Sequence, residues 1–104
     1  MAQFDVFANP IIAARRAYPY VIAMQSDFSI DAHDQIVAPL APRESMATVA
    51  GRLTPKVMLH GVEHIVLVPA LSGLKSRDLR ERHGSLASAR SELLAAIDYL
   101  FFGV

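Results

Sequence analysis

The sequence contains no cysteine, and it has no excess of charge of either sign. Without cysteine there is no disulfide framework and no thiolate chemistry, which fits a protein of a reducing cytoplasm. Ten basic and ten acidic residues give a formal net charge of zero. Proteins that bind nucleic acid unaided carry a basic excess that displaces counterions, so the composition argues against direct DNA or RNA binding.

Long apolar runs are also missing. No segment approaches the roughly 20 residues needed to span a bilayer, because Asp98 and Pro69 interrupt the best candidates. The first ten residues, MAQFDVFANP, have no basic segment followed by an apolar run, so we expect no signal peptide. These absences predict a cytoplasmic protein that does not interact with membranes.

Apolar residues are nevertheless abundant. They make up 53% of the chain, and the mean hydropathy is +0.31. With 104 residues the chain has the size of one domain, and we predict a single domain over residues 1–104. Because a small domain has much surface and little core, some of this apolar excess should lie on the surface. That favours an oligomer or an obligate partner.

Short apolar segments between turns predict a mainly β structure up to residue 71. The expected strands are residues 3–7, which alternate polar and apolar as a half-buried strand does, 21–24, 35–38, and a hairpin of 56–60 and 64–68 around a loop at 61–63. Pro39 and Pro42 should confine the end of the third strand to a sheet edge or a loop. Residues 74–84 have mixed charges and are predicted to be a polar connector. Residues 11–17 and 45–52 remain open.

The last twenty residues, 85–104, predict an α-helix. Its apolar stripe recurs at steps of three and four and consists of Leu86, Ala89, Leu93, Ile97 and Leu100. Ser85 is the expected N-cap. Several short strands followed by one helix predict a small β-barrel or a curled sheet with the helix packed on it.

Two aromatic rings stand at the end of this helix, followed by Gly103 and Val104. Adjacent helical positions point about 100° apart, so the rings of Phe101 and Phe102 should not share one face. We expect Phe101 to complete the core and Gly103 to end the helix. For Phe102, a place in the core and exposure to a partner are equally open.

Histidines offer the most obvious candidate metal site. His60 and His64 flank the predicted hairpin loop, with Glu63 beside them, and three ligands are the minimum for zinc. A His-x₃-His spacing is diagnostic only on a helix, however. A structural role is therefore favoured over a metal site.

Enzymatic signatures are equally weak. Ser26, Asp27 and His33 could be drawn as a triad, but nothing around them resembles a nucleophile elbow. No glycine-rich phosphate loop is present. We predict no catalytic residue, no metal and no cofactor.

Several short segments together carry a family resemblance. They are Gln3-Phe4-Asp5-Val6, Gln25-Ser26-Asp27, Pro39-Leu40, Leu53-Thr54-Pro55, Gly61 in the hairpin turn, and the ending Ala96-Ile97-Asp98-Tyr99-Leu100-Phe101-Phe102-Gly103-Val104. In this order and at this length the chain resembles, nearly end to end, the CcdB family of plasmid and chromosomal toxins that target DNA gyrase. The resemblance implies an SH3-like small barrel with a C-terminal helix and a homodimer. It also implies a disordered, CcdA-like antitoxin encoded beside the toxin.

The resemblance further implies a mechanism without enzymatic activity. The toxin dimer wedges into the A subunit of gyrase and traps the complex in which DNA is cut, which stalls replication. Through its antitoxin, the toxin also acts as a co-repressor at operator DNA. The family's gyrase-binding residues map onto Phe102, Gly103 and Val104. The best-known member has Trp and Ile in place of Phe102 and Val104. Phenylalanine keeps a flat ring that can stack on a guanidinium, but loses area and the indole N–H donor.

A different class of toxin is the alternative. The MazF ribonuclease toxins share this barrel, and their loop after the first strand carries catalytic basic residues. Arg15 and Arg16 lie in about that region. The neutral charge and the Phe-Phe-Gly-Val ending argue against a ribonuclease. A third possibility is an operator-binding partner of the antitoxin with no toxicity left, which is compatible with the first.

Overall fold

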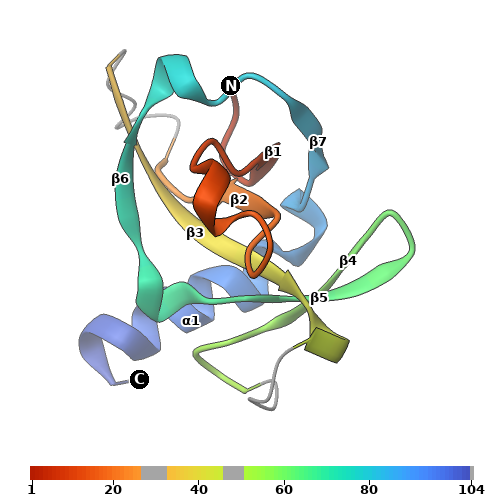
Figure 1. Cartoon of the computed structure of the whole chain (residues 1–104). Coiled ribbons are helices and arrows are strands. Elements are labelled where there is room, and N and C mark those ends of the chain that lie inside the picture. Colours follow the sequence, from red (N-terminus) through yellow and green to blue (C-terminus); the bar gives the residue numbers. More distant parts are fainter. Residues whose placement is uncertain (27–32, 46–50, 104) are drawn as a thin grey trace.

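The computed structural model describes residues 1–26, 33–45 and 51–103 (Figure 1). The strands are β1 (Asp5–Ala8), β2 (Tyr20–Ala23), β3 (Asp34–Pro42), β4 (Lys56–Leu59), β5 (Val62–Val66), β6 (Ser72–Lys75) and β7 (Arg82–Ser85). Short 3₁₀ turns are η1 (Ile12–Ala14), η3 (Arg43–Ser45), η4 (Val68–Ala70), η5 (Ser76–Asp78) and η6 (Ala87–Ala89). Helix α1 (Arg90–Phe102) follows them. The predicted mainly β fold with a C-terminal helix is confirmed.

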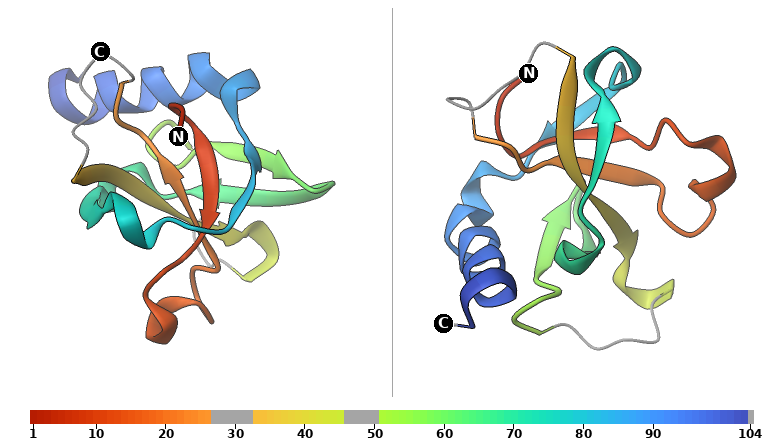
Figure 2. Two further views of the ribbon diagram at one scale, coloured as in Figure 1. Left: turned by 90° about the horizontal axis from the view of Figure 1, so that it is seen from above. Right: turned by 90° about the vertical axis from the view of Figure 1, so that its left-hand side faces the viewer.

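All the strand pairs are antiparallel, in the order β4-β5-β3-β2-β1-β7, with β6 also paired to β3. Figure 2 shows α1 lying across one side of this curled sheet. Within the described residues no ladder joins β4 to β7, so the sheet is a half-barrel. Its two open edges approach each other through side chains. The ring centroid of His60, in the β4–β5 turn, lies 6.0 Å from that of His83 on β7.

The long strand β3 organises the sheet because it has neighbours on both sides. On one side it pairs with β2, and on the other with β6 as far as Val37 and with β5 from Leu40 onward. Pro39 lies where the second side changes partner, and its carbonyl accepts a hydrogen bond from the Leu67 N–H at 2.9 Å. A residue's N and C=O point to the same side of a strand. The nitrogen of Pro39 therefore faces the gap between the β6 and β5 ladders, where no N–H donor is needed. β3 continues through Pro39 to Pro42, so the expectation of a strand end at Pro39 is wrong.

Strands β6 and β7, with η5 between them, replace most of the polar connector that the sequence predicts. Both are short and largely exposed. Neither shows the alternation of apolar and polar residues that marks a half-buried strand. β1 is more buried than the sequence predicts. Asp5, Val6 and Phe7 are all buried, so the expectation of a half-buried strand is wrong.

The β4–β5 hairpin turns through two residues, His60 and Gly61, with Leu59 paired to Val62. Both turn residues have positive φ, 53° and 76°. These values are those of a type I′ turn, whose twist matches the twist of the strands. The predicted loop at 61–63 is therefore wrong, since Val62 and Glu63 already belong to β5.

The main core lies between the sheet and α1. Its buried members are Phe4, Val6, Ile22, Met24, Ala38, Leu40, Val57, Leu59, Val66, Val68, Leu86, Leu93 and Ala96. A buried leucine such as Leu93 contributes about 1.5–3 kcal/mol. The helix begins at Arg90, later than expected. Ser85 Oγ accepts the Ala87 N–H at 3.1 Å, at the first residue of η6. The N-cap of α1 is Ala89, so the expectation of Ser85 at this position is wrong. Of the open segments, 11–17 holds η1, and 46–50 lies outside the described residues.

Candidate partner-binding site

The last turn of α1 carries a cluster of exposed aromatic side chains. Phe101 is 63% exposed, Phe102 74% and Tyr99 36%. On the same helix Leu93 and Ala96 are completely buried. The helix is thus fixed by one face and presents rings at its end.

The positions of the rings follow from helical geometry and from where the sheet ends. Phe102 lies nine residues after Leu93, which turns it about 180° from the buried face at roughly 100° per residue. Of the two possibilities left open for Phe102, a place in the core or exposure, the structure shows exposure. Phe101 was expected in the core, and this is wrong. Leu100 holds the core-facing position of that turn, and Phe101 points about 100° away from it.

Gly103 ends α1, as predicted, in the left-handed conformation with φ of 73° and ψ of 20°. Its N–H donates to the carbonyl oxygen of Tyr99 at 3.0 Å. This is how a glycine closes a helix, since a side chain disfavours positive φ. A Cβ added to Gly103 would meet nothing within 4 Å, so the space beside it is open. Val104, the third predicted site residue, lies outside the described residues.

Sequence reasoning missed Phe101 and Tyr99 as parts of this exposed surface. The available signal was that Phe101 directly follows Leu100, the last position of the apolar stripe. Two large side chains in succession cannot both face the sheet.

The structure does not assemble the hypothetical zinc ligands. His60 is exposed in the turn, whereas His64 is buried with Nδ1 2.9 Å from the carbonyl oxygen of Val62. The Glu63 carboxylate lies 3.5 Å from Lys56 Nζ. In the described parts of the chain, no three His, Asp or Glu side chains are grouped to hold a metal ion. Asp27, the third residue of the hypothetical triad with Ser26 and His33, lies outside the described residues.

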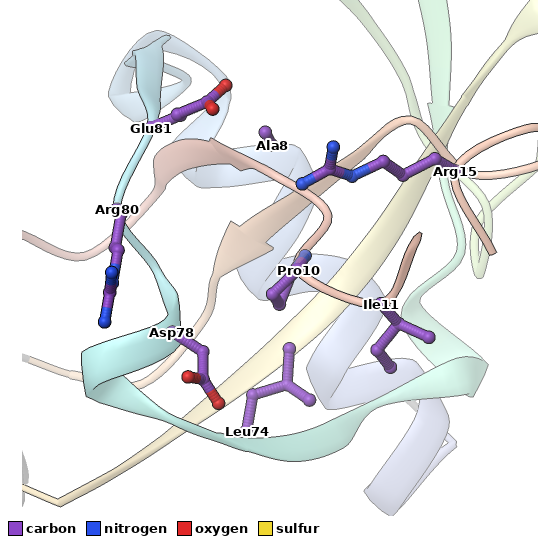
Figure 3. Close-up of a pocket in the computed structure, with 8 residues that line it drawn as sticks. All are labelled: Ala8, Pro10, Ile11, Arg15, Leu74, Asp78, Arg80 and Glu81. Atoms are coloured by element: carbon purple, nitrogen blue, oxygen red, sulfur yellow. The ribbon is translucent and has the colours of Figure 1, made fainter. Parts of the chain in front are cut away.

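A cavity of about 370 Å³ lies beside the segment that follows β1 (Figure 3). It is lined by Ala8, Pro10, Ile11, Arg15, Leu74, Asp78, Arg80 and Glu81. Arg15 Nε donates to the carbonyl oxygen of Asn9 at 2.5 Å. Two guanidinium groups share the lining with two carboxylates, so the cavity offers no net positive charge for an RNA phosphate. Arg16, the second residue of the ribonuclease hypothesis, is exposed and does not line the cavity.

Fold and site define a class: a small antiparallel half-barrel whose C-terminal helix exposes aromatic rings at its end. Within the described residues no helix is long and apolar enough to cross a membrane.

The sequence model of the CcdB protein family matches residues 3–103. The chain therefore belongs to the CcdB family, which confirms the resemblance drawn from the sequence. Membership implies a gyrase-poisoning toxin of a toxin–antitoxin module, which acts without being an enzyme, with gyrase A and a CcdA antitoxin as partners. A search of curated proteins finds no significant match.

Proposed function

We propose that Phe102 and Gly103, together with Val104, bind the A subunit of DNA gyrase and trap gyrase on cleaved DNA, which blocks replication. One observation carries this proposal: Phe102 is 74% exposed at the end of a helix whose opposite face is buried. A ring held in this way needs no rearrangement before it stacks on a guanidinium or fills an apolar slot. Aromatic rings that become buried when a complex forms dominate the binding energy of many interfaces.

The remaining partners follow from the same assignment. A cognate CcdA-like antitoxin neutralises the toxin and brings it to operator DNA, where the two co-repress their operon. The net charge of zero supports DNA contact through the antitoxin only. A homodimer would present two tails to the symmetric gyrase A dimer. Exposed apolar side chains such as Met58 and Val62 leave surface available for these contacts.

A gyrase cleavage assay tests the proposal, with purified protein, supercoiled plasmid, gyrase and ATP, beside an RNA-degradation control. We expect linear DNA only when both protein and gyrase are present. Phe102→Ala should weaken gyrase binding by about 30-fold or more, as removal of a hot-spot ring does, and should abolish linear DNA. Its circular dichroism spectrum and melting temperature should stay unchanged, because the ring is exposed.

Ile12→Ala is the matched control, since Ile12 is 77% exposed and lies in η1, outside α1. It should keep full cleavage activity. Equal activity in both variants, or equal loss, would reject the role of the tail. Cut RNA without linear DNA would place the protein among ribonucleases, and the absence of both products would reject gyrase poisoning and leave only the regulatory role.

A further inference from the structure

Arg52 reaches the tail from a distant part of the chain. Its Cζ lies 4.0 Å from the centroid of the Tyr99 ring, which is the geometry of a cation–π contact. Tyr99 belongs to the last turn of α1, and its carbonyl oxygen is the acceptor for the Gly103 N–H. Arg52 thus contacts the residue whose backbone holds Gly103 in place.

The loop that carries Arg52 is itself well tied down. Gly51 N–H donates to the Thr54 carbonyl oxygen at 3.2 Å, and Thr54 N–H donates to the Gly51 carbonyl oxygen at 3.1 Å. The next residue, Pro55, accepts a hydrogen bond from the Val66 N–H at 3.0 Å, which extends the β4–β5 ladder to this turn. Arg52 therefore projects from a closed turn that is anchored to the sheet.

Charge favours the same placement. The C-terminal end of a helix carries a partial negative charge, which a nearby cation stabilises. The last turn of α1 has no basic residue of its own. Arg52 supplies this cation from another segment, and only while it is held over the Tyr99 ring, so removal of the ring should remove both effects.

We propose that Arg52 is a positioning residue for the gyrase-binding tail: by stacking on Tyr99 it holds the last turn of α1, and with it Phe102 and Gly103. Phe102 lies three residues after Tyr99 and is its neighbour on the helix surface. A ring already held in its bound orientation loses less freedom on binding, which raises affinity. This role depends on the proposed function, whereas the underlying contact can be tested without gyrase.

The first measurement uses the free protein. Amide hydrogen exchange of Gly103 is compared by NMR in wild type, Arg52→Ala and Arg52→Lys, with Arg77→Ala as a control that removes an equal charge from η5. A cation–π contact at an exposed site corresponds to about a two- to five-fold change in an equilibrium constant. Exchange at Gly103 should become faster by about this factor in Arg52→Ala. It should be largely restored in Arg52→Lys and unchanged in Arg77→Ala.

The second measurement is the affinity of the same variants for purified gyrase A subunit, by calorimetry. Arg52→Ala should weaken binding by a similar factor of about two to five, and should lower the melting temperature by only a few degrees, because both side chains of the contact lie at the surface. In a Tyr99→Leu background, Arg52→Ala should have no further effect. Tyr99→Phe, which keeps the ring, should bind as the wild type does.

Two results would overturn this role. One is wild-type exchange at Gly103 in Arg52→Ala, which would mean that the contact does not hold the turn. The other is an undiminished effect of Arg52→Ala in the Tyr99→Leu background, which would mean that Arg52 touches gyrase directly. If the wild type fails to bind gyrase A at all, the proposed function fails, while the exchange of Gly103 still decides whether Arg52 holds the helix end.

Discussion

Asp5 and Arg82 form an ion pair between the first and last strands of the chain. Asp5 Oδ1 accepts from Arg82 Nη2 at 3.2 Å, and Asp5 Oδ2 accepts from the Ala2 N–H at 3.0 Å. The Asp5 side chain is only 8% exposed, whereas that of Arg82 is 55% exposed. The pair lies on the β1–β7 ladder, so it secures the strand from which the chain enters η6 and α1.

Asp5→Asn should destabilise the protein by about 1–3 kcal/mol, because an amide places a donor against one of the two N–H groups that the carboxylate now accepts. The measurement is the free energy of unfolding in urea. Lys75→Ala is the control, since the Lys75–Asp34 pair is exposed on both sides and should contribute less than about 1 kcal/mol. Equal losses in the two variants would show that burial of Asp5 adds nothing.

Gly103→Ala should weaken gyrase binding by about five- to 30-fold, because a left-handed φ costs an L-residue about 1–2 kcal/mol. Gly103→Asn should lose less, since asparagine tolerates this conformation. Calorimetric titration with gyrase A measures both. A larger and equal loss in both variants would indicate that gyrase approaches the bare glycine backbone, where any side chain obstructs it. Wild-type affinity in Gly103→Ala would contradict the role of this residue.

His60→Asn should raise the melting temperature by about 2–4 °C, because asparagine followed by glycine is the preferred pair of a type I′ turn. His60→Val is the opposite test, since a β-branched residue is a strained choice at the φ of 53° seen here. It should lower the melting temperature. Calorimetric melting curves that place the two variants in the reverse order would contradict the assigned turn.

Arg15→Ala combined with Arg16→Ala should leave gyrase-dependent DNA cleavage intact. The cost should be about 1 kcal/mol of stability for the lost hydrogen bond to Asn9. Neither the wild type nor the double variant should degrade RNA. Degradation by the wild type that disappears in the double variant would instead support the ribonuclease alternative.

The apolar strands could be predicted because their own side chains fill the core. β2 and β4 lie within one residue of the expected bounds at both ends. β7 could not be found in this way, since Arg82, His83, Gly84 and Ser85 include no apolar side chain. It is a strand because β1 has a free edge there. Gly84 suits the position because its φ of 142° is a value that residues with a side chain rarely adopt.

The site divides in the same manner. Periodicity identifies the buried face of α1, but the exposure of Phe101 depends on how far the sheet extends beneath the helix, which no local pattern contains. The family resemblance, and not the pattern, pointed to Phe102. The contact of Arg52 with Tyr99 joins segments far apart in the sequence. The only local sequence feature that relates to this contact is the absence of a basic residue from the last turn of α1.

The pairing of β1 with β7 also bears on how the protein is made. β1 is synthesised before the other strands, yet its second neighbour in the sheet, β7, is synthesised after all of them. Contacts between such distant segments are slow to form, because a long loop must close first. On the ribosome the sheet therefore stays incomplete until residues 82–85 have been synthesised. The exposed rings of α1 gain a rigid support only after β7 has paired with β1.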